Sequence, residues 1–157
     1  MSILFFPSFA RAAFAERLIK TAPHMQYAIF GSGGAEAVEI ALKTARYTTK
    51  RKKIVSIIKG YHGHSGLSVA TGDERFSRIF LSERPDEFIH VPFNDVDALE
   101  DVLKNRDVAG FIVETIPATY GFPMPADGYP NACQDLCRQS RPKFIPAAAQ
   151  TGPERPG

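Results

Sequence analysis

The sequence is short of cysteine, of net charge and of long apolar runs, and each shortage excludes a class of protein. Two cysteines among 157 residues, Cys133 and Cys137, supply no disulfide framework, and two ligands alone make no zinc site. A formal net charge of +2 is too small to indicate a nucleic-acid-binding face, and the basic run at 50–53 is interpreted as a solvated helix end. The N-terminal apolar run at 3–6 stops at Pro7, so we expect no signal peptide and no membrane span, and we predict a cytoplasmic protein.

Strand-like and helix-like patterns alternate along the chain. Continuous apolar runs are typical of buried strands, and apolar residues spaced three or four apart are typical of one face of a helix. The predicted strands lie at 27–30, 54–58, 90–91 and 108–113, the predicted helices at 9–21, 35–50, 95–103 and 130–139, and the predicted loops at 60–72 and 115–128. Because the two kinds of element alternate, the sequence predicts an α/β fold, a three-layer α/β/α arrangement with a mostly parallel sheet.

The last stretch of the sequence, residues 141–157, has a different composition. It holds four of the chain's prolines, and Pro146 would remove a backbone donor from a central strand. Residues 144–145 could begin one more strand, but we expect 141–157 to be atypical and irregular.

A glycine-rich turn, Gly31–Gly34, lies between the predicted strand at 27–30 and the helix after it. Glycines at such a turn let backbone amides approach an anion, and the helix N-terminus adds unpaired donors. Ala35 and Glu36 stand where a P-loop needs lysine and serine or threonine, and Glu36 also replaces the third glycine of a dinucleotide fingerprint. A plain phosphate cup and a structural turn with no ligand both remain open.

Three further segments follow predicted strands, where open parallel sheets bind their ligands. Tyr61 and the loop after it follow the strand at 54–58, Glu114 follows the strand at 108–113, and Gln150 follows the doubtful strand at 144–145. His62 and His64 alternate like metal ligands, but no third ligand follows at a convincing spacing. Hydrogen bonding within the loop is therefore favoured over a metal site.

Together these segments resemble the class III, fold-type-I aminotransferases, which use pyridoxal phosphate. Residues 32–46 look like that family's Asn-Ser-Gly-Thr-Glu-Ala helix start, and 61–64 look like its aromatic-His-Gly segment. Residues 113–117 resemble its Val-Glu-Pro segment, and 125–136 resemble its Pro-x-Gly-Tyr helix entry. The order and the spacing agree over roughly residues 25–140.

The resemblance implies seven cofactor-binding residues: Gly33, Gly34, Ala35, Tyr61, His62, Glu114 and Gln150. The backbone of the first three would hold the cofactor phosphate. Tyr61 would stack on the pyridine ring, and His62 would support that loop. Glu114 would lie near the substrate side of the ring, and Gln150 would bond the 3-oxygen of the ring.

The sequence also departs from the family pattern. Ala147 stands where the family has the aspartate that keeps the pyridine nitrogen protonated, and the lysine that forms the Schiff base would lie beyond Gly157. We therefore expect residues 1–157 to form part of the large, cofactor-binding domain, with no catalytic residue of its own and no useful transaminase activity alone.

The family resemblance carries expectations about partners and leaves alternatives open. It implies an amino donor with a 2-oxo acid or aldehyde acceptor, pyridoxal 5′-phosphate as cofactor, no metal, no nucleic acid and no membrane, and a homodimer. Because Tyr61–His64 also resembles the glutamate-semialdehyde aminomutases, a fragment of such an enzyme is one alternative. A non-catalytic truncated product is the other.

Overall fold

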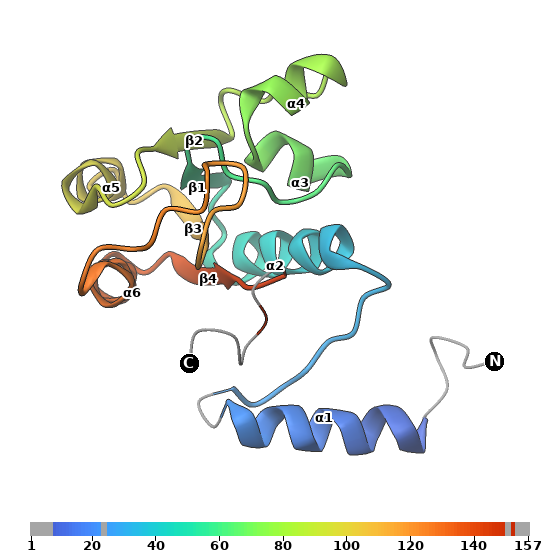
Figure 1. Ribbon diagram of the computed structural model, residues 1–157. Coiled ribbons are helices and arrows are strands. Elements are labelled where there is room, and N and C mark those ends of the chain that lie inside the picture. The colour runs from blue at the N-terminus through green and yellow to red at the C-terminus, as the bar shows by residue number, and fades with distance from the viewer. Residues whose placement is uncertain (1–7, 23–24, 150–151, 153–157) are drawn as a thin grey trace. The chain divides into compact units, whose positions relative to one another are not determined.

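The structure, a computed structural model, describes residues 8–22, 25–149 and 152 and divides the chain into two compact units, 1–31 and 32–157 (Figure 1). The first unit contains helix α1 (Phe9–Thr21), where the Ser8 hydroxyl caps the helix by accepting from the Arg11 amide. The rings of Phe14 and Phe30 stack with centroids 5.5 Å apart. The predicted helix at 9–21 is confirmed.

The strand predicted at 27–30 is wrong. Residues 25–31 are irregular, and within the described residues no strand pairs with them. Tyr27 and Ile29 keep most of their side-chain surface exposed. An apolar run becomes a strand only where another strand accepts its hydrogen bonds, and the residues of the first unit that the structure describes form none.

The second unit is built on a four-stranded parallel sheet in the order β2-β1-β3-β4. The strands are β1 (Lys53–Ile57), β2 (Phe88–Val91), β3 (Val108–Glu114) and β4 (Lys143–Ala147), and the helices are α2 (Gly34–Thr49), α3 (Gly66–Thr71), α4 (Glu74–Ile79), α5 (Val96–Leu103) and α6 (Tyr129–Ser140). The predicted α/β class with a mostly parallel sheet is confirmed. Within the described residues, no helix is long and apolar enough to cross a bilayer.

Two segments differ from the prediction. The expected loop at 60–72 contains the short helix α3, which a capping box between Ser65 and Ser68 begins. Residues 143–147 form β4 although Pro146 lies within it. The Ala147 carbonyl accepts from the Thr115 amide, and because alternate residues of a strand face the same neighbour, the Pro146 nitrogen faces away from β3. An edge strand tolerates proline at such a position.

Helices α5 and α6 lie on one face of the sheet and α2 and α3 lie on the other (Figure 1), and an apolar core lies beneath each pair. Beneath α5 and α6 the buried side chains include many large ones: Val55, Ile57, Phe93, Leu99, Leu103, Phe111, Tyr129, Cys133 and Cys137. Beneath α2 and α3 they include several small ones: Leu42, Ala45, Ile54, Ala70, Phe88, Ala109 and Ile112. Gly110 adds to this, since a Cβ there would stand 3.3 Å from the Ala45 Cβ. These small side chains let α2 lie close to the sheet.

The strand order creates a switch point in the winding of the chain. From β1 the chain passes to β2 on one side, then crosses to β3 on the other side of β1. Neighbouring connections therefore leave the carboxyl ends of β1 and β3 in opposite directions, and a crevice opens there. The loop that holds Tyr61 follows β1, and Glu114 ends β3, so both lie at this crevice.

Candidate functional site

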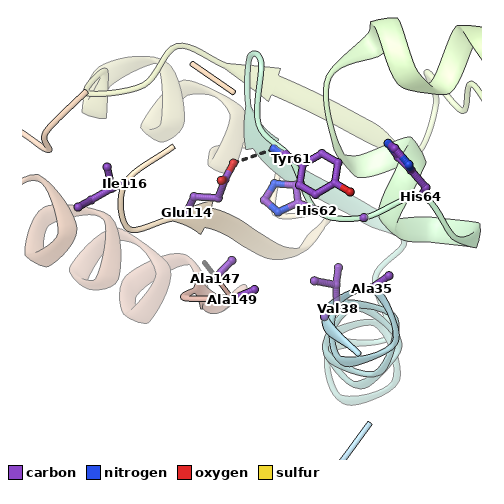
Figure 2. Close-up of a pocket in the computed structure, with 11 residues that line it drawn as sticks. Ala35, Val38, Tyr61, His62, His64, Glu114, Ile116, Ala147 and Ala149 are labelled. Carbon is purple, nitrogen blue, oxygen red and sulfur yellow. Dashed lines mark hydrogen bonds between the residues drawn. The ribbon is translucent and has the colours of Figure 1, made fainter. Parts of the chain in front are cut away.

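A cavity of about 270 Å³ lies at the carboxyl edge of the sheet (Figure 2). Four separate segments form it: the start of α2, the loop after β1, the end of β3 with the residues after it, and the end of β4. The residues that line it are Gly34, Ala35, Val38, Tyr61, His62, Gly63, His64, Glu114, Ile116, Ala147 and Ala149.

The first turn of α2 faces this cavity with its backbone amides free of side-chain caps. Its N-cap residue is Gly33, and no side chain of the described residues caps the helix. The Glu36 carboxylate, which could compete for these amides, instead accepts from the amide and the hydroxyl of Ser32, the latter at 2.7 Å. These bonds lower the pKa of Glu36. The helix start therefore offers donors and a positive dipole end to an anion.

The loop after β1 approaches α2 closely through Gly63. This residue has φ +111°, and a Cβ there would lie 2.6 Å from the Ala35 Cβ. Both the positive φ and the close contact require glycine at this position. The close approach holds Tyr61 over the same cavity that α2 opens into, and the Tyr61 ring packs edge-on against His64 and Phe76, with centroids 5.3 and 5.7 Å away.

Glu114 ties the loop after β1 to the loop after β3. Its Oε1 accepts from the Tyr61 amide at 2.7 Å (Figure 2), and its Oε2 accepts from the Ala118 amide at 3.4 Å. Burial raises the pKa of Glu114, while the two backbone donors act in the opposite direction. The Glu114 carboxylate thus fixes the position of the Tyr61 backbone.

His62 is a buried imidazole at the edge of the cavity. Only 4% of its surface is exposed, and within the described residues neither ring nitrogen has a hydrogen-bond partner. Burial, with a smaller contribution from His90, lowers the pKa of His62 to about 4. The ring is therefore neutral at physiological pH.

The structure brings together most of the residues that the sequence singled out. Five of the seven line the cavity, while Gly33 lies next to it as the N-cap of α2. Gln150 lies outside the described residues. Ala147 also lines the cavity. Within the described residues, no group of three His, Cys, Asp or Glu side chains is placed to bind a metal.

Sequence reasoning missed four lining residues. Val38 reads as part of the apolar face of a helix, and Ile116 and Ala149 carry no chemical signal. Gly63 had a signal in the sequence, since a glycine between two histidines marks a sharp turn. Its contact with α2 depends on how the two segments pack.

The chemistry of this lining fits a phosphorylated flat ring. The start of α2 suits the phosphate, Tyr61 supplies an aromatic face, and the methyl groups of Ala147 and Ala149 supply an apolar wall. A ring with an anionic arm therefore matches both the polar and the apolar parts of the cavity.

Comparison with known proteins identifies the family. The sequence model of "Aminotransferase class-III" matches residues 1–157, and the chain belongs to the class III aminotransferases. The chain is 39% identical over 148 residues to an uncharacterized aminotransferase of Archaeoglobus fulgidus, covering 94% of this chain and 34% of that protein. It is 36% identical over 135 residues to the acetylornithine aminotransferase of Bacillus cereus, covering 85% of this chain and 34% of that protein.

A solved structure gives the same result for the fold. The ornithine aminotransferase of Toxoplasma gondii, described with partial occupancy of PLP at its active site, superposes with a TM-score of 0.82 at 25% identity. That match covers 92% of this chain and 36% of the other chain. The chain thus spans about a third of the length of the relatives it matches.

Proposed function

We propose that this chain is the cofactor-binding part of a pyridoxal-phosphate-dependent aminotransferase, one that transfers an amino group to a 2-oxo acid or an aldehyde. Pyridoxal phosphate is the cofactor expected of this family. The observation that carries the proposal is the cavity itself, where the start of α2, Tyr61 and Glu114 meet although they are far apart in the sequence.

Each part of the chain has a defined task in this proposal. The amides of Gly34 and Ala35 hold the phosphate, Tyr61 covers one face of the ring, and Glu114 fixes Tyr61 through its backbone amide. When bound, the cofactor supplies an aldehyde and an electron-withdrawing ring for amino-group transfer. His62 keeps its neutral ring packed under the loop that holds Tyr61.

The proposal also concerns what the 157 residues do alone. Among the described residues, no lysine lines the cavity, and Ala147 presents a methyl group instead of a carboxylate. We therefore expect reversible binding of the cofactor without covalent attachment and without useful transamination. A homodimer and a cytoplasmic location are part of the proposal, and the exposed apolar side chains of Ile79, Phe80 and Leu81 support self-association.

Cofactor binding is tested by titrating the chain with pyridoxal 5′-phosphate and recording the absorbance and fluorescence of the cofactor. We expect saturable binding that Tyr61→Ala weakens about three- to tenfold, while Tyr61→Phe, the matched control, retains it. Treatment with borohydride followed by intact-mass measurement should show no stoichiometric adduct. A one-to-one adduct at a single lysine would contradict the proposal of noncovalent binding, and a lack of saturation would contradict cofactor binding.

A further inference from the structure

Glu39 lies on α2, and its side chain reaches across to the helix α3, which follows the loop after β1. Its Oε1 accepts a hydrogen bond from the Ser68 amide at 2.9 Å, although the two residues are 29 positions apart in the sequence. Ser68 is completely buried and Glu39 is half-buried. The carboxylate is therefore a contact between two elements of the fold and not a solvated charge on the surface of α2.

The backbone at Gly66 also lies against this carboxylate. Gly66 has φ +26°, and a Cβ there would stand 2.9 Å from the Glu39 Oε1. One turn earlier on α2, Ala35 contacts Gly63 at a similarly short distance. Residues four apart in a helix share a face, so Ala35 and Glu39 together hold residues 63–68 along one side of α2.

These contacts determine where the Tyr61 ring lies relative to α2. Tyr61 and Ala35 line the same cavity from opposite sides (Figure 2). The bond from the Tyr61 amide to Glu114 fixes the start of the loop to β3, and the bond from Ser68 to Glu39 fixes its end to α2. The distance between the ring and the amides of α2 therefore depends on both carboxylates.

From these contacts we infer that Glu39 is a positioning residue of the cofactor site. Its carboxylate holds the loop after β1 at the distance from α2 at which one ligand contacts both the amides of this helix and the Tyr61 ring. Glu39 is not among the described residues that line the cavity, so it acts through the loop. This inference rests on the proposed function and adds a residue to it.

The first test needs no ligand. Amide hydrogen exchange, followed by nuclear magnetic resonance, is compared in the wild type, Glu39→Ala and Glu39→Gln. Removal of the acceptor by Glu39→Ala should raise the exchange rates of the Ser68 and Tyr61 amides about threefold or more, whereas Glu39→Gln keeps an acceptor oxygen and should retain most of the protection. A rise at Ser68 alone, or at neither amide, would overturn the inference, because Glu39 would then not hold the part of the loop that carries Tyr61.

The second test separates the two parts of the ligand. Pyridoxal 5′-phosphate contacts the helix and the ring together, whereas inorganic phosphate, measured by its competition with the cofactor, contacts α2 alone. We expect Glu39→Ala to weaken binding of the cofactor about three- to tenfold and binding of phosphate less than about twofold, since only the ring contact is lost. Glu100→Ala removes an exposed glutamate from α5 and is the matched control, which should change neither affinity. Equal losses for the two ligands would contradict the inference, because a general loosening of the fold weakens both.

A double-mutant cycle measures whether Glu39 acts through Tyr61. The Tyr61→Ala chain has no ring to position, so adding Glu39→Ala to it should weaken cofactor binding less than about twofold. A loss as large as that seen in the wild-type background would show that Glu39 acts by another route, and would refute the inference.

The inference and the proposed function fail separately. If the wild type binds pyridoxal 5′-phosphate and Glu39→Ala binds it equally well, the proposed function stands and the inference is wrong. If the wild type does not bind the cofactor, the proposed function is wrong, and hydrogen exchange at Tyr61 alone decides whether Glu39 positions this loop.

Discussion

The two faces of the sheet are packed with different side chains, and the start of α2 lies over one of them. Beneath α5 and α6, rings and branched side chains such as Phe111 and Leu99 form the core. Beneath α2 and α3, small residues such as Ala45 and Ala109 bring the helix close to the sheet. Large side chains hold one face together, and small ones place the amides of α2 beside the strand ends on the other. Substitutions on the two faces should therefore fail in different ways.

The largest effect is expected on the face of the sheet beneath α5 and α6. Phe111 is completely buried and packs against Phe144, so Phe111→Ala should lower the free energy of unfolding by about 3–5 kcal/mol through lost burial and the cavity it leaves. Urea denaturation followed by circular dichroism measures it. Phe122→Ala is the matched control, since 69% of that side chain is exposed and the change should stay within about 0.5 kcal/mol. Similar losses for the two variants would show that Phe111 contributes no more to stability than an exposed phenylalanine does.

The next effect tests the buried imidazole on the cavity face. Because the pKa of His62 is lowered to about 4, the folded chain binds fewer protons there than the unfolded chain does. The contribution of His62 to the free energy of unfolding is fully present above pH 6.5. It is lost as the pH falls from 6.5 to 4, and the total loss is on the order of 3 kcal/mol. Urea denaturation at pH 7, 5.5 and 4.5 should show the wild type losing more stability than His62→Leu. Equal losses of stability in the wild type and in His62→Leu would mean that the His62 imidazole has a hydrogen-bond partner in solution.

The smallest expected change in stability comes from substituting leucine for each of two alanines near α2. Ala109 is completely buried in β3, so Ala109→Leu should overpack the core and cost about 1–3 kcal/mol. Ala147 is half-buried and lines the cavity, so Ala147→Leu should change stability by less than about 0.5 kcal/mol. The second variant should instead abolish binding of pyridoxal 5′-phosphate. A stability loss at Ala147 equal to that at Ala109 would show that the cavity is part of the packed core.

Much of the fold could be predicted from local patterns. The buried runs at 54–58 and 108–113 and the amphipathic helices around them match the observed elements within a few residues, because burial on both faces leaves a direct trace in the sequence. The strand at 27–30 was wrong, since a four-residue apolar run contains no information about whether another strand pairs with it. Strand β4 was doubted because of Pro146, and the edge position that permits this proline is a property of the assembled sheet.

Candidate residues at the site could be found from the sequence, but their arrangement could not. The glycines before α2, Tyr61 and Glu114 each lie at an element boundary that the sequence marks. The bond from the Tyr61 amide to Glu114 joins residues 53 positions apart, and the enclosure of His62 depends on packing between elements. Neither has a local signal.

By itself, the sequence determined which residues carry polar chemistry and which strands are buried, because backbone preference and hydrophobic pattern act over a few residues. Tertiary structure alone decided that the start of α2 and the ends of β1, β3 and β4 share one cavity, and that its single described carboxylate is occupied by backbone amides. The reason is physical: a cavity is the space that packing leaves between distant segments, and its chemistry depends on which polar atoms remain free after the segments have bound one another.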